Sequence, residues 1–289
     1  MASTQQLKSR IRSVKSTKQI TKAMQMVAAS KMRRAQEAVK ASEEYTNAAN
    51  ELLTFFASQG ITDRHPFFQE RKVKSRLLIV ITGDKGLAGA YNSNIAKTYI
   101  TAMREDKKDG IQTKTIAVGR KASQYAVRLN NADIIGVYEN LPDRPGTSEM
   151  RAILDTAIAK FESGEVDAVD VIYTRFISGM NQQATVKRIL PAGFDETEVS
   201  DDVINAAYEP SASEVLRGVS YRLVLTQIYQ AILDARASEH SMRMMAMKNA
   251  TDNASELADD LTLEMNKARQ GAITQELAEI SGGVEALSE

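Results

Sequence analysis

The fold is decided by residues 4–58, TQQLKSRIRSVKSTKQITKAMQMVAASKMRRAQEAVKASEEYTNAANELLTFFAS, which contain neither proline nor glycine. Proline destabilises a helix interior by about 3 kcal/mol and glycine by about 1 kcal/mol, so this stretch predicts one continuous helix. Apolar and small residues recur along it at coiled-coil spacing, which predicts that one face packs against a partner helix. This face consists of Met24, Ala28, Ala35, Ala38, Tyr45, Ala49, Leu52 and Phe56.

The partner helix is predicted at the other end of the chain. Residues 211–281 contain no proline and only two glycines, Gly218 and Gly271. Their apolar stripe consists of Val224, Ile228, Ala231, Ala235, Ser238, Met242 and Met245, followed by Ala254, Leu257, Leu261, Met265 and Ala268. One helix leads into the middle of the chain and the other leads out of it, so the two can pair only as an antiparallel coiled coil. Pairing residue 58 with residue 211 places residue 18 near residue 251.

The distribution of charge supports this pairing. The first 36 residues contain nine basic residues and no acidic one. Residues 252–264 have the opposite charge. They contain no basic residue and five acidic ones: Asp252, Glu256, Asp259, Asp260 and Glu264. In the expected register these stretches meet across the seam. Because an exposed ion pair contributes only about 0–1 kcal/mol, the charges are expected to set the register more than the stability.

Between the two arms the sequence changes to an α/β pattern. Residues 77–82, LLIVIT, predict a continuous apolar strand, as expected when helices cover both faces of a sheet. The expected strands are residues 77–82, 113–118, 133–138, 169–176 and 185–190, and the expected helices are residues 92–107, 121–129 and 148–161. This alternation predicts a mainly parallel sheet, with the last strand pairing as an antiparallel hairpin.

The predicted fold class is therefore α/β: a long antiparallel coiled coil of the N- and C-terminal helices plus a central Rossmann-like α/β domain with a mainly parallel sheet. The expected segments are a coiled-coil helix over residues 1–60, the α/β domain over residues 75–210 and a second coiled-coil helix over residues 211–289. The second helix is the longer by about 14 residues, or roughly 20 Å. Its unpaired end carries an apolar stripe that needs another protein around it, namely Ile273, Leu277, Ile280, Val284 and Leu287.

Composition excludes several classes of function. The 289 residues include no cysteine, which excludes disulfides, zinc–thiolate sites and thiol chemistry, and only two histidines, His65 and His240. Basic and acidic residues balance at 37 each, so no net field favours nucleic acid or an anionic membrane. The longest apolar run, residues 77–81, is far shorter than the roughly 20 residues of a membrane span. No apolar block of a signal peptide opens the sequence.

The most suggestive chemical motif is residues 83–92, GDKGLAGAYN, a glycine-rich turn between a strand and a helix, where phosphate can bind. It lacks the Gly-Lys-Ser/Thr ending of a P-loop and the spacing of a dinucleotide fingerprint. We therefore interpret it as a structural turn, with a phosphate- or nucleotide-binding α/β protein with a coiled-coil arm as the alternative. A basic arm that binds nucleic acid is a further alternative, although no aromatic residues are interleaved for base stacking. No arrangement predicts catalytic residues, a metal site or a bound cofactor.

Several segments resemble one known family. Residues 20–33, ITKAMQMVAASKMR, resemble the N-terminal signature of the gamma subunit of F-type ATP synthase. Residues 245–254 (MAMKNATDNA), 266–270 (NKARQ) and 273–280 (ITQELAEI), with Gly282 and Gly283 after them, resemble its C-terminal helix. Residues 83–92 also resemble the first strand–turn–helix of this family, and the similarity covers the whole chain in order.

The resemblance implies a non-catalytic rotor shaft of the bacterial enzyme. The coiled coil would fill the axis of a ring of three alpha and three beta subunits. Ion-driven rotation of the membrane rotor ring would turn the shaft and change the nucleotide affinity of each beta subunit in turn. The α/β domain would contact the epsilon subunit and the c subunits of the rotor ring. The chain would be a peripheral protein on the cytoplasmic side of the cell membrane, with no membrane span and no nucleic-acid partner.

Particular residues are expected to make these contacts. Because the family resemblance covers their segments, Met24, Arg269, Gln270 and Glu276 are expected to contact the beta subunit. Arg269 and Gln270 would form a polar latch to a carboxylate of one beta subunit, since an Arg fork and an amide form directional hydrogen bonds. Tyr208 and Glu209, where an acidic loop enters the C-terminal helix, are expected to contact epsilon and the rotor ring.

Overall fold

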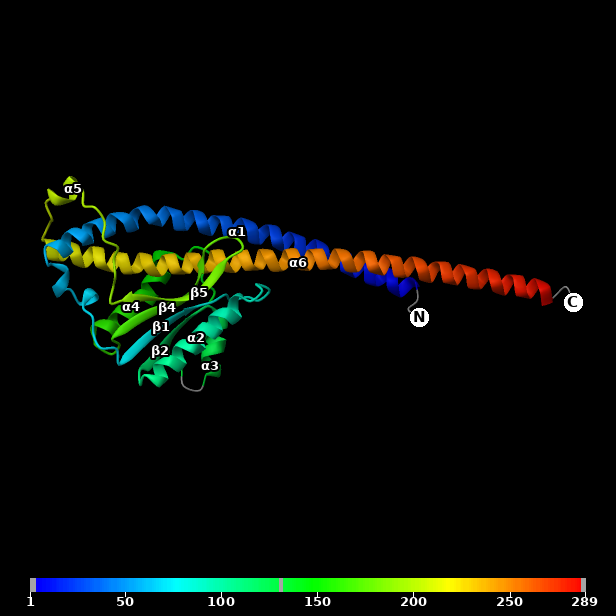
Figure 1. The fold of residues 1–289 in the computed structure, drawn as a ribbon, viewed down its shortest axis with the longest axis horizontal. Coiled ribbons are helices and arrows are strands. Elements are labelled where there is room, and N and C mark those ends of the chain that lie inside the picture. The colour runs from blue at the N-terminus through cyan, green and yellow to red at the C-terminus, as the bar shows by residue number, and fades with distance from the viewer. Residues whose placement is uncertain (1–3, 130–131, 287–289) are drawn as a thin grey trace. The chain divides into compact units, whose positions relative to one another are not determined.

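The computed structural model describes residues 4–129 and 132–286 (Figure 1). Two helices occupy the ends of the chain, α1 (Thr4–Ser58) and α6 (Ala212–Ala286). The chain divides into two compact units, a larger one of residues 29–243 and a smaller one of the segments before residue 29 and after residue 243. Each long helix therefore contributes to both units. The division into segments 1–60, 75–210 and 211–289 stays a prediction.

The larger unit contains a five-stranded sheet in the order β3-β2-β1-β4-β5. Its strands are β1 (Ser75–Ile81), β2 (Gln112–Val118), β3 (Asp133–Tyr138), β4 (Ala168–Phe176) and β5 (Gln182–Leu190). The first four are parallel, and β5 pairs antiparallel with β4 as the predicted hairpin. The predicted fold class, an α/β domain with a mainly parallel sheet between two long helices, is confirmed.

Helices cover both faces of this sheet (Figure 1), which explains the unbroken apolar run of β1. Leu78 and Val80 pack into one core with α2 (Tyr91–Lys108) and α3 (Arg120–Arg128). Leu77, Ile79 and Ile81 pack into the opposite core with α4 (Thr147–Glu162) and residues 224–235 of α6. Each of these β1 side chains is at most 3% exposed. Burial of such a side chain contributes about 1.5–3 kcal/mol, so β1 is the centre of the domain.

Three short elements complete the larger unit and were not expected from the sequence. Two 3-10 turns, Thr62–Arg64 and Pro66–Phe68, follow α1, and α5 (Asp201–Ile204) lies in the acidic loop before α6. Phe67 inserts into the sheet core with 4% exposure. The link between α1 and β1 is thus held by a side chain, and not only by the chain connection.

In the larger unit, the last turns of α1 pack antiparallel against the first turns of α6. The buried members of this contact are Ala49, Leu53, Phe56, Leu216 and Leu223. Leu53 is fully buried, whereas Leu52, which the predicted stripe placed in the seam, is half-buried. Tyr45, also in that stripe, is 39% exposed. A straight helix drifts by roughly 20° per heptad against a strict 3.5-residue repeat, so the seam moves to neighbouring positions.

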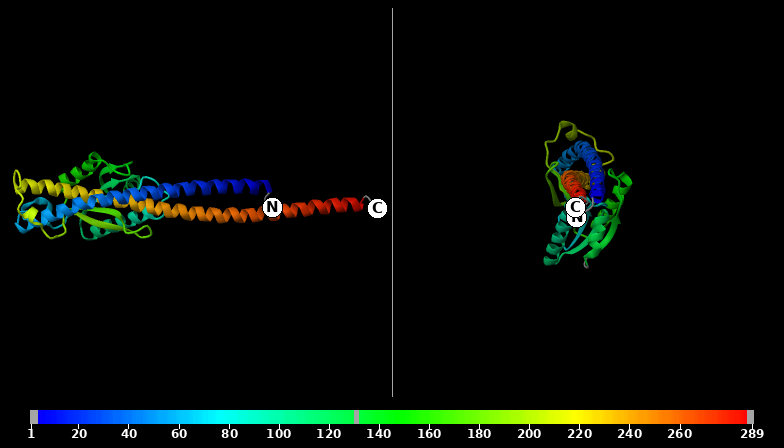
Figure 2. Two further views of the ribbon diagram at one scale, coloured as in Figure 1. Left: turned by 90° about the horizontal axis from the view of Figure 1, so that it is seen from above. Right: turned by 90° about the vertical axis from the view of Figure 1, so that its right-hand side faces the viewer.

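In the smaller unit, residues 4–28 of α1 run antiparallel to α6 (Figure 2). The hydroxyls of Thr21 and Thr251 share a hydrogen bond of 2.8 Å, and Lys18 Nζ donates to Ser255 Oγ at 2.8 Å. Residue 251 therefore faces residue 21 and not residue 18, a shift of three positions from the predicted register. Consistent with this shift, Ala258 is 5% exposed and Leu257, predicted for the seam, is 49% exposed.

The expected pairing of charges across this seam is not found. Among the residues that the structure describes, no ion pair joins residues 4–28 to residues 252–264, and Lys18 donates to a serine hydroxyl instead. Long side chains in water lose conformational entropy when they form a pair, which offsets most of the Coulomb energy. The buried hydroxyl pair and the small side chains of the seam hold the register.

The last part of α6 exposes apolar side chains, as predicted. The helix continues through Gly271 without interruption, and Figure 2 shows it extending past the start of α1 in the smaller unit. Ile273, Leu277 and Ile280 are 46%, 60% and 65% exposed. The side chains of Val284 and Leu287 lie outside the described residues. None of the helices described is long and apolar enough to cross a membrane.

We predict that Leu53→Ala lowers the free energy of unfolding by about 2–5 kcal/mol, because it leaves a cavity between α1 and α6. Leu52→Ala, which removes the same atoms from a half-buried neighbour, should cost about 1 kcal/mol or less. Urea unfolding of the full chain measures both. Equal losses in the two variants would contradict the assignment of the seam to Leu53.

Candidate functional site

The glycine-rich loop after β1 satisfies its polar groups from within the chain. One carboxylate oxygen of Asp84, Oδ1, accepts hydrogen bonds from the backbone N–H of Arg120 at 2.9 Å and of Asn140 at 3.1 Å. Arg120 is the first residue of α3, so this carboxylate occupies the kind of helix start where phosphate binds in other proteins. Asn92 closes the loop, since its Oδ1 accepts from Gly83 N at 3.1 Å.

The glycines of this loop allow it to approach α6. A Cβ on Gly83 would lie 2.8 Å from Glu239 Oε1, and one on Gly89 would lie 4.0 Å from the Met242 carbonyl oxygen. Arg243 also reaches back, donating to the Gly86 carbonyl at 3.4 Å. Real Cβ atoms do not tolerate a contact as short as the first one, so Gly83 has a packing role. Lys85 is exposed.

Opposite the loop, α6 presents a cluster of buried ionic side chains. Arg236 and Arg243 donate to the two carboxylate oxygens of Glu239, at 3.1 and 2.6 Å. Arg236 and Glu239 are 7% and 4% exposed. Arg236 also lies 3.8 Å from Asp84 Oδ2, which links the cluster to the loop. Burial, reinforced by the negative charge of Glu239, raises the pKa of Tyr91 beside this cluster.

The loop between β3 and α4, residues 139–146, holds both long helices within the larger unit. Asp143 forms an ion pair with Lys31 of α1 at 2.8 Å and lies 3.3 Å from His240 Nε2 of α6. The neighbouring Arg144 donates to the backbone carbonyl of Arg34 at 2.8 Å. The carbonyl of Leu141 accepts from Arg236 at 2.9 Å. We call residues 139–146 the β3–α4 strap, because they fasten the sheet domain to α1 and α6.

Protonation of the strap follows from burial and charge. Burial lowers the pKa of His240, and this outweighs the opposite effects of Glu239 and Asp143. The neutral ring can donate from Nε2 to Asp143 and accept at Nδ1 from Arg243, 3.3 Å away. Burial alone would raise the pKa of Asp143, but Lys31 and His240 hold it below the usual value. At pH 7 Asp143 is therefore a carboxylate and His240 a neutral imidazole, as the contacts of the strap require.

The residues predicted to contact epsilon and the rotor ring lie in the larger unit. The Tyr208 ring packs on Phe55 and Phe56, with centroids 5.9 and 5.1 Å apart, and its hydroxyl donates to the Val203 carbonyl. Tyr208 is therefore engaged in the packing of the chain itself, whereas the neighbouring Glu209 is exposed. Their contact with other subunits stays a prediction. The exposed carboxylate of Glu209 is better placed for such a contact than the packed ring of Tyr208.

The residues predicted to contact the beta subunit lie in the smaller unit. Arg269, Gln270 and Glu276 are exposed on α6, and Met24 is half-buried on α1. Their role also stays a prediction. Sequence reasoning missed three further exposed apolar side chains on α1: Ile20 (58%), Met26 (60%) and Val27 (56%). The sequence contains a pattern that predicts this exposure, because residues 20–28 carry more apolar side chains than one helix–helix seam can bury.

The fold thus defines a class: a coiled-coil protein with an α/β domain inserted between its helices, with apolar helix surfaces open to further chains. In the described part, no group of three or more His, Cys, Asp or Glu side chains could hold a metal ion. The family model described as ATP synthase matches residues 3–287. The chain belongs to this family, among its gamma chains.

The similar proteins and solved structures match this chain over most or all of its length. The ATP synthase gamma chain of Macrococcus caseolyticus is 40% identical over 287 residues, covering 99% of this chain and 100% of the relative. That of Legionella pneumophila is 38% identical over 292 residues, with the same coverage. A chain of the Euglena gracilis mitochondrial ATP synthase has the same fold, with a TM-score of 0.65 at 17% identity, covering 98% of this chain and 94% of that one. A chain of the Tetrahymena thermophila mitochondrial ATP synthase central stalk has a TM-score of 0.58 at 23% identity, covering 80% and 99%.

We predict that His240 makes the stability depend on pH. Because its pKa is lowered in the folded chain, the unfolded chain binds the proton first, and stability falls as the pH drops below about 6.5. The slope from one such group is at most about 1.4 kcal/mol per pH unit. His240→Gln should flatten the curve between pH 7 and 5.5, as measured by urea unfolding.

The control for this prediction is the second histidine. The pKa of His65 is also lowered, by burial and by Arg217, so His65→Gln should remove its own separate share of the slope. An unchanged slope in His240→Gln, with the slope lost in His65→Gln, would show that the strap histidine does not titrate as described.

Proposed function

We propose that this chain is the central rotor shaft of a bacterial F-type ATP synthase. Ion flow turns the membrane ring and the shaft together, and the asymmetric shaft brings the three catalytic beta subunits in turn to different nucleotide affinities. The chain itself performs no chemistry. The observation that carries this proposal is the exposed apolar surface of the two helices in the smaller unit, in a member of the gamma chain family.

The composition of that surface suits rotation inside a ring of subunits. Ile20, Met26 and Val27 on α1 and Leu263 and Ile273 on α6 are each at least 46% exposed. Apolar contacts are non-directional and weak per atom pair, so they can be exchanged as the partner surface moves. A surface of this kind is costly in water, which supports an alpha–beta head as its permanent surrounding.

The larger unit supplies a route for torque. Residues 224–235 of α6 are part of the sheet core, and the β3–α4 strap ties the same domain to α1 through Lys31 and Arg34. A force applied to the sheet domain therefore acts on both long helices. Packed interiors have low compressibility, so little of that force is lost to deformation.

We place the chain at the cytoplasmic side of the cell membrane as a peripheral protein. Its partners would be the alpha and beta subunits, epsilon and the c subunits of the rotor ring. The absence of a membrane-crossing helix among the described residues is consistent with a subunit that reaches the membrane through others. The exposed carboxylate of Glu209, beside the packed ring of Tyr208, supports a polar contact with the rotor ring or epsilon.

The latch is tested by Arg269→Ala combined with Gln270→Ala. Hydrogen bonds to a charged group contribute about 1.5–3 kcal/mol each when water is excluded, so the assembled complex should turn over ATP at least about tenfold more slowly. Gln124→Ala with Arg128→Ala, an exposed pair of the same composition on α3, is the matched control and should leave ATPase activity unchanged. Parental ATPase activity in the Arg269/Gln270 variant, with assembly verified, would place the latch elsewhere.

The contact with the rotor ring is tested by Tyr208→Ala combined with Glu209→Ala. This variant should keep the ATPase activity of the head but pump fewer ions per ATP, because the shaft slips against the ring. Tyr208→Phe retains the ring packing on Phe55 and Phe56 and should behave like the parent. Glu209→Ala alone should show most of the loss. Parental pumping per ATP in the double variant would exclude these two residues from the contact.

A further inference from the structure

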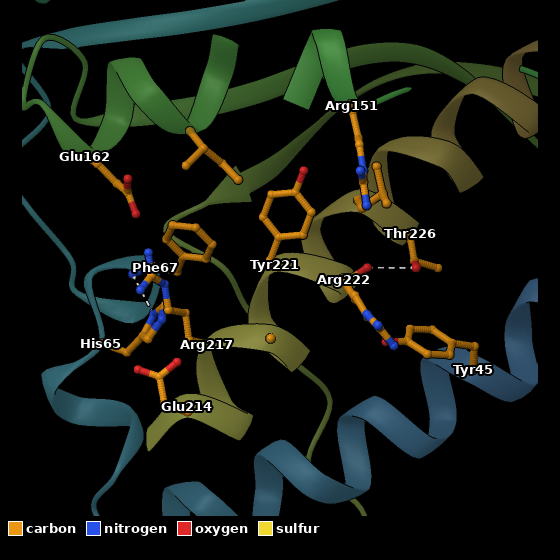
Figure 3. Close-up of a pocket in the computed structure, with 13 residues that line it drawn as sticks. Tyr45, His65, Phe67, Arg151, Glu162, Glu214, Arg217, Tyr221, Arg222 and Thr226 are labelled. Atoms are coloured by element: carbon orange, nitrogen blue, oxygen red, sulfur yellow. Dashed lines mark hydrogen bonds between the residues drawn. The ribbon is translucent and has the colours of Figure 1, made fainter. Parts of the chain in front are cut away.

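The larger unit contains a pocket that neither the fold nor the proposed function uses (Figure 3). Its volume is about 730 Å³, within the roughly 300–1,000 Å³ that is usual for small-molecule sites. Its walls are formed by the first turns of α6, one side of α4, Tyr45 of α1 and the 3-10 turn Pro66–Phe68. Phe67, Ile158 and Leu225 provide apolar lining and Tyr45 and Tyr221 add aromatic rings. Five lining residues are charged: Arg151, Glu162, Glu214, Arg217 and Arg222.

Three guanidinium groups line this pocket: Arg151 of α4 and Arg217 and Arg222 of α6. Within the described part of the chain, none of the three forms an ion pair or a side-chain hydrogen bond. This differs from Arg236 and Arg243 in the same unit, which are paired with Glu239. All three arginines are exposed. The lining also includes Glu162 and Glu214, so the pocket holds three guanidinium groups and two carboxylates.

The charges are distributed unevenly. Figure 3 shows Glu162, Glu214, Arg217 and His65 on one side of the Tyr221 ring and Arg151 and Arg222 on the other. The hydroxyl of Tyr221 donates to Asp155 at 2.7 Å, which fixes the ring between the two sides. His65 adds no charge, because burial and the nearby Arg217 lower its pKa. The side with Arg151 and Arg222 has no lining carboxylate, so an anion fits there.

Gly218 of α6 also lines the pocket. Glycine is a poor helix former, and a Cβ at this position would meet no atom within 4 Å. No packing requirement within the chain therefore explains a glycine in the interior of α6. Gly218 is itself a lining residue, so a larger side chain here would occupy part of the pocket.

We propose that this pocket is a binding site for a phosphoryl anion, with Arg151 and Arg222 binding the phosphate oxygens. Guanidinium groups from two different helices suit a phosphate because it offers oxygens in several directions and accepts bidentate hydrogen bonds. Tyr221 and Leu225 then pack against the organic part of the ligand. A free phosphate ester and a phospholipid headgroup share this chemistry. The site does not depend on the proposed rotor function.

The experiment uses the full chain alone, so its outcome is independent of assembly with other subunits. Isothermal titration with inorganic phosphate and with glycerol 3-phosphate tests free ligands. Co-sedimentation with phosphatidylcholine vesicles, with and without phosphatidylglycerol, tests a lipid headgroup. We expect saturable binding in at least one arm, weakened about tenfold or more by Arg151→Gln with Arg222→Gln. Arg104→Gln with Arg128→Gln, an exposed pair outside the pocket with the same change in charge, is the control.

A second variant separates loss of binding from loss of folding. Gly218→Leu fills the pocket and should abolish binding without lowering the unfolding midpoint, since the new side chain enters open space. Gly271→Leu, the same change at another open glycine of α6, should leave binding unchanged. Binding in the vesicle arm alone identifies a lipid headgroup, and binding in the titration alone a free ester. No binding by the parent in either arm, or binding retained in both pocket variants, overturns the proposal.

Discussion

One helix has to satisfy two packing requirements, and the rest of the structure depends on this constraint. Over its first turns α6 packs against α1 through Leu216 and Leu223, and over residues 224–235 it completes the core beneath the sheet. A helix with apolar residues on more than one side is stable only when it is covered on each of them. The sheet domain and α1 supply these covers. Removing either cover would expose one apolar side of α6, so the helix needs both.

The same constraint explains what happens at the carboxyl ends of the parallel strands. In open α/β sheets this edge is where ligands usually bind. Here the side chains of α6 change from apolar to ionic as the helix passes the glycine-rich loop, and Arg236, Glu239 and Asp84 fill the space. Buried charges are stable only when they are paired and hydrogen-bonded, which these are. A region that could hold a cofactor is instead used to position a helix.

The two units use α1 and α6 in different ways. In the larger unit the helices are fixed by large apolar side chains and by the strap, so their faces are covered. In the smaller unit the seam consists mostly of small side chains and one buried pair of hydroxyls, Thr21 and Thr251. Alanine and threonine bury little area, and several large apolar side chains there, such as Met26 and Leu277, are exposed. That surface is available to other subunits in the proposed complex.

Local sequence patterns were enough to predict the architecture. The absence of helix breakers predicted α1 over residues 4–58, and the apolar run at residues 77–82 predicted a strand covered on both faces; both depend on local backbone and burial preferences that are written in the chain. Family motifs located the expected contact residues Arg269, Gln270, Met24 and Glu276. These motifs could not reveal the strap, the role of Gly83 or the pocket at Gly218.

Those features were decided by the tertiary structure, because they depend on which side chains meet across large separations in sequence. Asp143 meets Lys31 and His240, and Asp84 meets the start of α3, only through the tertiary fold. The register of the coiled coil was missed for a related reason. It depends on a three-residue shift that places Thr21 opposite Thr251, and heptad spacing alone is compatible with either register. Local preferences specify which elements form, whereas steric fit and the pairing of buried polar groups specify how they meet.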